Sequence, residues 1–200
     1  LGLPATLEGV NEIEVGGRRI AGTGGGQIGN AVVVVGNFLF DFPAEVMARA
    51  WRVPSPEFRR LAEDGLRRHL ATLSLTAGNH PAEAEVREQL LRAYEEELGR
   101  PLVPGTLSPF EEAAVLREEK RLAHLDEAGN GGWRRRAGLK VTHRVWVHEW
   151  QGRVGAGWTR VTARVADGWI EELVVAGAAL EREEAERRIA RVMDRVGRGR

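Results

Sequence analysis

The 200-residue chain contains no cysteine. Disulfides, thiolate zinc ligands and a cysteine nucleophile are therefore excluded within these residues. Acidic and basic residues balance at 29 each, which removes the basic footprint typical of a dedicated nucleic-acid binder. No apolar run approaches the roughly 20 residues that a membrane span needs, and the N-terminus does not resemble a signal peptide. We expect a soluble, cytoplasmic protein that binds neither nucleic acid nor membrane.

An initiating methionine is also missing, because the chain begins with Leu1. This start predicts that the sequence is the later part of a longer product. Lysine is scarce: Lys120 and Lys140 are the two lysines among 29 basic residues. Hydrophobic residues make up 42% of the chain, which is enough to build a packed core.

The first forty residues have the pattern of strands and turns. Asn11–Val15 predicts a short strand, Gly16-Gly17 a two-residue hairpin turn, and Arg18–Gly22 the returning strand. This hairpin is expected to bring the side chains of the first and second strands together. A mobile glycine-rich loop is predicted over Gly22–Gly29. The nearly continuous apolar stretch Ala31–Phe42 is typical of a strand covered on both faces.

The glycine run Gly24–Gly29 fits the pattern G-x-G-x-x-G. A dinucleotide-binding fingerprint must open a helix, whose N-terminus then meets the pyrophosphate. Here the run leads into the valine-rich residues 30–35, which predict a strand. The pattern therefore favours a loop between two strands, of a kind that can still cover a bound ligand.

Helical signals dominate residues 43–128. Pro81 is expected to open one helix at its first position, and Gly99 to end it. Ser108 begins a capping box with proline at the first helical position of a further helix. The Asn130–Gly132 segment is the best candidate for a linker, because the character of the sequence changes after it.

The last sixty residues predict a three-stranded antiparallel sheet packed by one helix. Alternating apolar residues indicate strands at Leu139–Trp150, Trp158–Val165 and Trp169–Val175. The turn Ala166–Gly168 is of the Asp-Gly kind that joins hairpin strands. A helix is expected over residues 180–196, which completes a small α+β unit.

Neither the histidines nor the arginine run indicates a site. His143 and His148 lie at an odd separation, so on one strand they would face opposite sides and could not share a metal ion. Arg134–Arg136 beside Trp133 is most simply a solvated turn. The sequence leaves the presence of a metal site unknown.

Residues 8–23, with Asn11-Glu12 before the turn and Arg19-Ile20-Ala21-Gly22-Thr23 after it, resemble the lipoate–protein ligase family. Residues 34–39 are similar to the family's next strand, and the chain from Leu139 onward to its accessory C-terminal domain. The implied fold class is α+β: a partial class II synthetase/biotin-ligase-like mixed sheet with helices, plus a small C-terminal antiparallel sheet-and-helix domain. The implied boundaries are 1–130 for the catalytic part and 137–200 for the accessory domain.

The resemblance implies that lipoate and ATP form lipoyl-adenylate, with magnesium. A lysine of a lipoyl-acceptor domain, from a 2-oxoacid dehydrogenase or the glycine cleavage H protein, then takes the acyl group. Arg19 stands at the place of a family lysine that reaches phosphate and carbonyl oxygens, and is expected to be the catalytic clamp. Asn11 and Glu12 are expected beside the nucleotide, with Gly22 and Thr23 completing the binding residues. The predicted hairpin places Asn11 near Arg19.

This chain departs from the family at several positions. The family has lysine at position 19, aspartate at position 12 and paired histidines where Val34-Val35 stand. Its upstream arginine–glycine substrate-binding motif is absent, so a separate N-terminal half is a possible partner and this chain alone is expected to be inactive. Two alternatives stay open: a degenerate, non-catalytic relative that binds an acyl group or an acceptor domain, and an unrelated α+β binding module.

Overall fold

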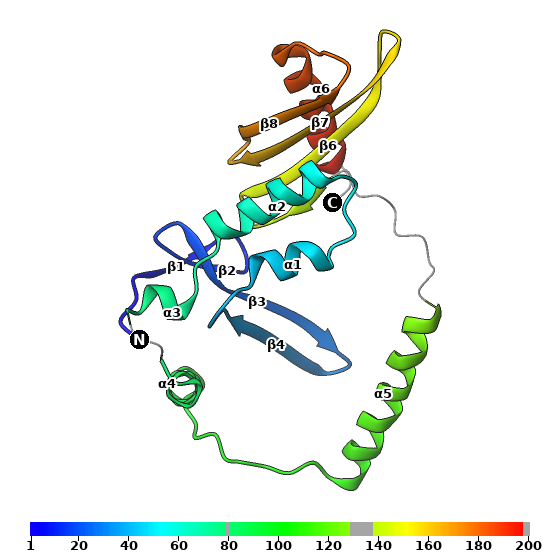
Figure 1. Ribbon diagram of the computed structural model, residues 1–200. Coiled ribbons are helices and arrows are strands. Elements are labelled where there is room, and N and C mark those ends of the chain that lie inside the picture. Colours follow the sequence, from blue (N-terminus) through cyan, green and yellow to red (C-terminus); the bar gives the residue numbers. More distant parts are fainter. Residues whose placement is uncertain (79–80, 129–137, 198–200) are drawn as a thin grey trace. The chain divides into compact units, whose positions relative to one another are not determined.

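A computed structural model describes residues 1–78, 81–128 and 138–197 (Figure 1). These residues form two four-stranded antiparallel sheets and six helices, which confirms the α+β class. One compact unit combines residues 1–81 with residues 137–200, and the second consists of residues 82–136. Of the helices described, none has the length and apolar character needed to cross a membrane.

The first sheet has the strands β1 (Ala5–Glu8), β2 (Glu12–Val15), β3 (Arg18–Ile28) and β4 (Ala31–Phe38), in that order. Strand β1 was not predicted. The predicted turn between β2 and β3 is confirmed: Gly16 and Gly17 have φ values of +57° and +72°. Glycine adopts positive φ without steric cost, so this dipeptide fixes the tight turn.

The predicted loop over Gly22–Gly29 is wrong, because β3 continues through the glycine run to Ile28. Its residues pair in antiparallel register with β4, from Gly22 opposite Asn37 to Ile28 opposite Ala31. Glycine still offers its backbone N–H and C=O groups for pairing, and the valines of β4 favour the extended conformation. A strand follows the run, as predicted, so it does not open a dinucleotide-binding helix.

Strand β4 is exposed along its whole length, although its apolar sequence suggests cover on both faces. Its valines range from 37% exposed at Val33 to 78% at Val32. β4 is also an edge of the sheet in the described part of the chain. An apolar edge strand of this kind presents unpaired backbone groups to other chains.

Along the sequence, five helices follow β4 and precede the second sheet: α1 (Ala44–Ala50), α2 (Pro56–His69), α3 (Leu73–Thr76), α4 (Glu83–Leu98) and α5 (Pro109–Ala128). Pro81 does not open α4 as predicted; Ala82 is the N-cap, because it is the last residue with extended backbone angles. Gly99 ends α4 in the left-handed conformation, at φ +62°, as expected. The capping box is confirmed by hydrogen bonds in both directions between Ser108 and Glu111.

The second sheet has four strands rather than the three predicted: β5 (Gly138–Lys140), β6 (Val145–Val154), β7 (Gly157–Ala166) and β8 (Trp169–Gly177). The difference arises because residues 141–144 turn the chain and divide the expected first strand into β5 and β6. We call these four residues the β5–β6 turn. The Asp167-Gly168 hairpin turn is confirmed by φ values of +50° and +83°.

Helices α2 and α6 (Arg182–Gly197) pack against the second sheet (Figure 1). Buried side chains of α2, including Phe58 and Leu61, form one core with Val145 and Val147. Those of α6 form a second core with β7, around Ile189. Ser55 caps α2 by accepting the N–H of Phe58, and its hydroxyl donates to the buried carboxylate of Glu149.

The N-terminal and C-terminal sheets lie in the same compact unit. The expected division into domains 1–130 and 137–200 stays a prediction, and the expected linker at 130–132 and the arginine run at 134–136 lie outside the described residues. Contacts of α2 with β3, β6 and β7 connect the first sheet to the second. Polar contacts of Glu12 with Lys140 and His143 also connect them.

Candidate functional site

Glu12 is a buried carboxylate at the start of β2, with 1% of its surface exposed. Lys140 of β5 lies with Nζ 2.8 Å from Glu12 Oε1, and Arg19 of β3 with Nη1 3.7 Å from the same oxygen. The other carboxylate oxygen accepts the backbone N–H of His143 at 2.8 Å. A buried charge needs partners of this kind, because burial without them is costly.

These partners lower the pKa of Glu12 below its ordinary value. Burial by itself would raise the pKa, but the hydrogen bonds from Lys140 and His143 and the charges of Lys140 and Arg19 outweigh it. Glu12 is therefore ionised at neutral pH. It provides a fixed negative charge around which the two cations are arranged.

Glu14, two residues along β2, forms a second buried ion pair. Its Oε2 accepts from Arg144 Nη2 at 2.8 Å, and its Oε1 lies 3.5 Å from Nδ1 of His143. The same His143 nitrogen is 3.4 Å from Glu12. The β5–β6 turn and the strand before it thus supply a lysine, a histidine and an arginine to the two glutamates.

Glu12, Glu14 and His143 bring three possible metal ligands within 4.8 Å of one another. Each carboxylate, however, already has a cation at 2.8 Å: Lys140 for Glu12 and Arg144 for Glu14. Magnesium prefers open carboxylate oxygens and bound water in octahedral geometry. The residues that are present therefore do not fit a magnesium ion at Glu12.

Arg19 is held in place from several directions. Its backbone C=O accepts the N–H of Ala71, at 2.8 Å, and its Cα is opposite Glu14 in β2. Its guanidinium occupies the space in which a side chain on Gly22 would stand, and Asn37 Oδ1 borders the same space. The side chain is 29% exposed, so the guanidinium is reachable from solvent.

Asn11 and Thr23 meet through their backbones. The Asn11 C=O accepts the Thr23 N–H at 2.8 Å, and Asn11 is exposed to solvent. A register irregularity between Ile13 and Glu14 changes which residues are opposite across the hairpin. In β2, the Arg19 side chain forms an ion pair with Glu12, and the expected placement of Asn11 near Arg19 stays a prediction. The binding roles of Asn11, Glu12, Gly22 and Thr23 stay predictions.

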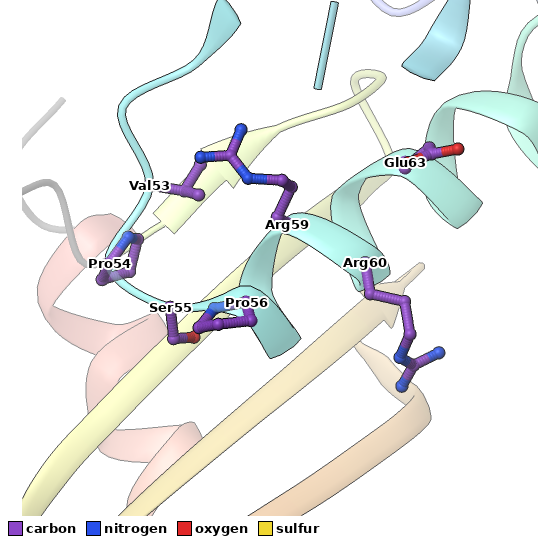
Figure 2. A pocket seen from close by; sticks show the side chains of 7 residues that line it. All are labelled: Val53, Pro54, Ser55, Pro56, Arg59, Arg60 and Glu63. Carbon is purple, nitrogen blue, oxygen red and sulfur yellow. The ribbon is translucent and has the colours of Figure 1, made fainter. Parts of the chain in front are cut away.

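A surface hollow of about 420 Å³ lies elsewhere, at the N-terminal end of α2 (Figure 2). Arg59 and Arg60 are both engaged there: Arg59 donates to the carbonyl groups of Ala48 and Trp51, and Arg60 pairs with Asp64 and Glu172. The hollow is lined by Val53, Pro54, Ser55, Pro56, Arg59, Arg60 and Glu63. No predicted site residue is among them.

The sequence interpretation missed Lys140, His143 and Arg144. Each lies about 130 positions from its glutamate partner, and no local spacing indicates such a contact. His143 was expected on the same strand as His148, but it lies in the β5–β6 turn. The scarcity of lysine was the one available signal, since a lysine in an arginine-rich chain is unusual.

The fold and the site together define an α+β protein with a cation pair fixed on a buried glutamate. No protein-family model matches the chain. An octanoyltransferase LipM from Symbiobacterium thermophilum is 30% identical over 122 residues, which cover 60% of this chain and 41% of the relative. The chain thus spans about two-fifths of the length of this curated relative.

A solved structure has a similar fold, with a TM-score of 0.51 at 23% identity over 56% of this chain and 44% of the other. It is described as a bi-partite lipoate protein ligase and its E2 lipoyl domain from Thermoplasma acidophilum. The chain is thus similar in sequence to part of an octanoyltransferase and similar in fold to part of a lipoate protein ligase.

Proposed function

We propose that this chain is part of a lipoate–protein ligase, which activates lipoate with ATP and transfers the lipoyl group to a lysine of an acceptor lipoyl domain. The observation that carries the proposal is the placement of Arg19. A buried, ionised Glu12 lies beside its guanidinium, and Gly22 leaves the space that it occupies. The relatives, an octanoyltransferase and a lipoate protein ligase, support the same class of acyl transfer.

The proposed reaction has two steps. A lipoate carboxylate oxygen attacks the α-phosphorus of ATP, so that pyrophosphate leaves and lipoyl-adenylate forms. The lysine amine of the acceptor domain then attacks the acyl carbonyl; AMP leaves, an amide forms and the amine loses a proton. Negative charge develops on phosphate oxygens in the first step and on the carbonyl oxygen in the second, so both steps are accelerated by a fixed cation.

Arg19 can supply that cation while it remains beside Glu12. A guanidinium has five N–H donors, and the 3.7 Å separation from Glu12 leaves donors for other oxygens. Its planar fork binds phosphate in a bidentate manner, which distinguishes it from the lysine expected from the resemblance. Asn11 and Thr23, adjacent at the end of the same hairpin, are proposed to border the nucleotide.

The ligase reaction needs no covalent intermediate on the protein, unlike acyl transfer through a thiol. These 200 residues contain no cysteine and so cannot supply a thiolate. This composition favours the ATP-dependent route over thiol-based octanoyl transfer for the chemistry of this chain.

The alternative is a degenerate relative that binds an acyl group or an acceptor domain without catalysis. The pairing of Glu12 with Lys140 favours it, because the carboxylate is then occupied and not open to a magnesium-bound nucleotide. The two candidates differ in one measurable property: only the ligase consumes ATP while modifying an acceptor.

The test uses the intact gene product that contains this chain, incubated with an apo lipoyl domain, lipoate and ATP. Mass spectrometry of the acceptor measures lipoylation. We expect Arg19→Ala to lower the rate by about 10²–10³-fold, the usual cost of losing one transition-state donor. Arg18→Ala, on the neighbouring residue of β3, should retain the rate. No ATP-dependent modification by the unmodified protein would refute the ligase proposal and support the alternative.

A further inference from the structure

Lys140 belongs to the second sheet, yet its ammonium lies at the Arg19 site. Its Nζ is 2.8 Å from Glu12 Oε1, and Arg19 Nη1 is 3.7 Å from that same oxygen. Because both nitrogen atoms lie near the same oxygen, the distance between them is at most the sum of these two distances. They share one carboxylate, which neutralises only one of their two charges.

The carboxylate of Glu12 is buried, whereas the two cations, Arg19 and Lys140, are partly exposed to solvent. The Glu12 side chain is 2% exposed, whereas those of Arg19 and Lys140 are 29% and 39% exposed. An ammonium has three donors and a guanidinium five, so both cations retain donors that the buried oxygen does not use. Two neighbouring cations on one buried carboxylate form a surface to which a second anion would be attracted.

The nearby charges balance, with Arg19, Lys140 and Arg144 against three carboxylates, so the attraction depends on the unused N–H donors of Arg19 and Lys140 and not on a net positive charge. Glu14 is itself buried and paired with Arg144, which also lies 3.7 Å from the exposed Asp167. His143 contributes no negative charge, and in its protonated form would add a positive one.

We propose that Lys140 and Arg19 together bind a phosphate-type anion, with Glu12 as the buried group that positions both. The identification of this anion with the phosphates of a nucleotide rests on the proposed function. The binding itself does not, since two fixed cations attract phosphate whether or not an acyl group is transferred. Residues of both sheets then contribute to one site, which requires the β5–β6 turn to remain packed on β2.

The scarcity of lysine allows a direct test on the full chain. Biosynthetic incorporation of lysine with ¹³C at Cε labels Lys120 and Lys140 and leaves the three N–H donors of each ammonium intact. Sodium pyrophosphate is titrated at constant ionic strength while the ¹³C signals are followed by NMR, with Lys120 of α5 as the internal control. We expect a saturable shift at Lys140 and none at Lys120. A Lys140 signal that does not move, or that moves only as Lys120 does, would show Lys140 to be merely the counter-ion of Glu12.

Calorimetry on unlabelled protein provides the second measurement. Lys140→Gln and Arg19→Ala should each raise the pyrophosphate Kd about tenfold, which corresponds to the loss of one charge-assisted hydrogen bond. Lys140→Arg should retain both folding and binding, and serves if Lys140→Gln does not fold. Unchanged affinity in a folded Lys140→Gln or Arg19→Ala variant would overturn the proposal. Pyrophosphate binding without lipoylation by the intact gene product would instead refute the proposed function alone.

Discussion

Replacing Gly22 by alanine tests whether the position of Arg19 matters separately from the stability of the fold. A Cβ at Gly22 would overlap Nη2 of Arg19, whereas the backbone there has no positive φ that alanine must avoid. To restore ordinary contact, the guanidinium would have to withdraw by about 1 Å. Because the obstacle is the far end of a flexible side chain, the displacement costs little stability. A misplacement of this size costs about 10²-fold in rate.

We therefore expect Gly22→Ala to lower the rate of ATP-dependent lipoylation about 10²-fold. The free energy of unfolding, measured by tryptophan fluorescence in urea, should stay within about 1 kcal/mol of that of the unmodified protein. Gly26→Ala is the matched control: it lies in the same strand, and a Cβ there meets no atom within 4 Å. Its rate should be unchanged. A Gly22→Ala protein with the full rate, or one that loses activity only because it unfolds, would refute the reasoning.

Three further perturbations address the fold and the buried charge. Ser55→Ala removes both an N-cap and a donor to Glu149, and should lower the unfolding free energy by about 2 kcal/mol in urea titrations; a loss no larger than that of the exposed cap variant Ser108→Ala would contradict this. The exposed apolar edge β4 predicts self-association in sedimentation velocity, and Val34→Lys, which places a charge on it, should reduce that association; equal association of the two proteins would contradict this. Because the folded pKa of Glu12 is lowered, its stabilisation is present above the ordinary value of 4.5 and is lost as the pH falls below it. Between about pH 5 and 3, the free energy of unfolding should therefore fall less in Glu12→Gln than in the unmodified protein. Parallel pH dependences of the two proteins would contradict the lowered pKa of Glu12.

Elements with strong local signals could be predicted from the sequence. Three such elements are confirmed: the Gly16-Gly17 turn, the Asp167-Gly168 turn and the Ser108 capping box. Each depends on residues within a few positions of one another. The prediction of a loop over the glycine run was wrong because the conformation of these residues is determined by pairing with β4 rather than by their own side chains. The division of β5 from β6 was missed because an alternating pattern does not show where a strand reverses.

The site was predicted only in part, and the reason is the sequence separation of its members. The hairpin predicted Asn11 near Arg19, whereas the structure pairs the Arg19 side chain with Glu12, the next residue along the chain. Lys140 and His143 are separated from Glu12 by about 130 residues along the chain and meet it where β5 and the β5–β6 turn contact β2. Such contacts depend on the tertiary fold, which short-range patterns do not specify.

The position of the adenylate phosphate relative to Arg19 tests the account most directly. A crystal structure of the intact gene product with a non-hydrolysable acyl-sulfamoyl adenosine would measure it. We predict that the sulfamoyl group lies within hydrogen-bond distance of the Arg19 guanidinium, about 3 Å, on the side away from Glu12. A sulfamoyl group bound instead in the hollow at Val53–Glu63, or anywhere beyond the reach of Arg19, would contradict the account.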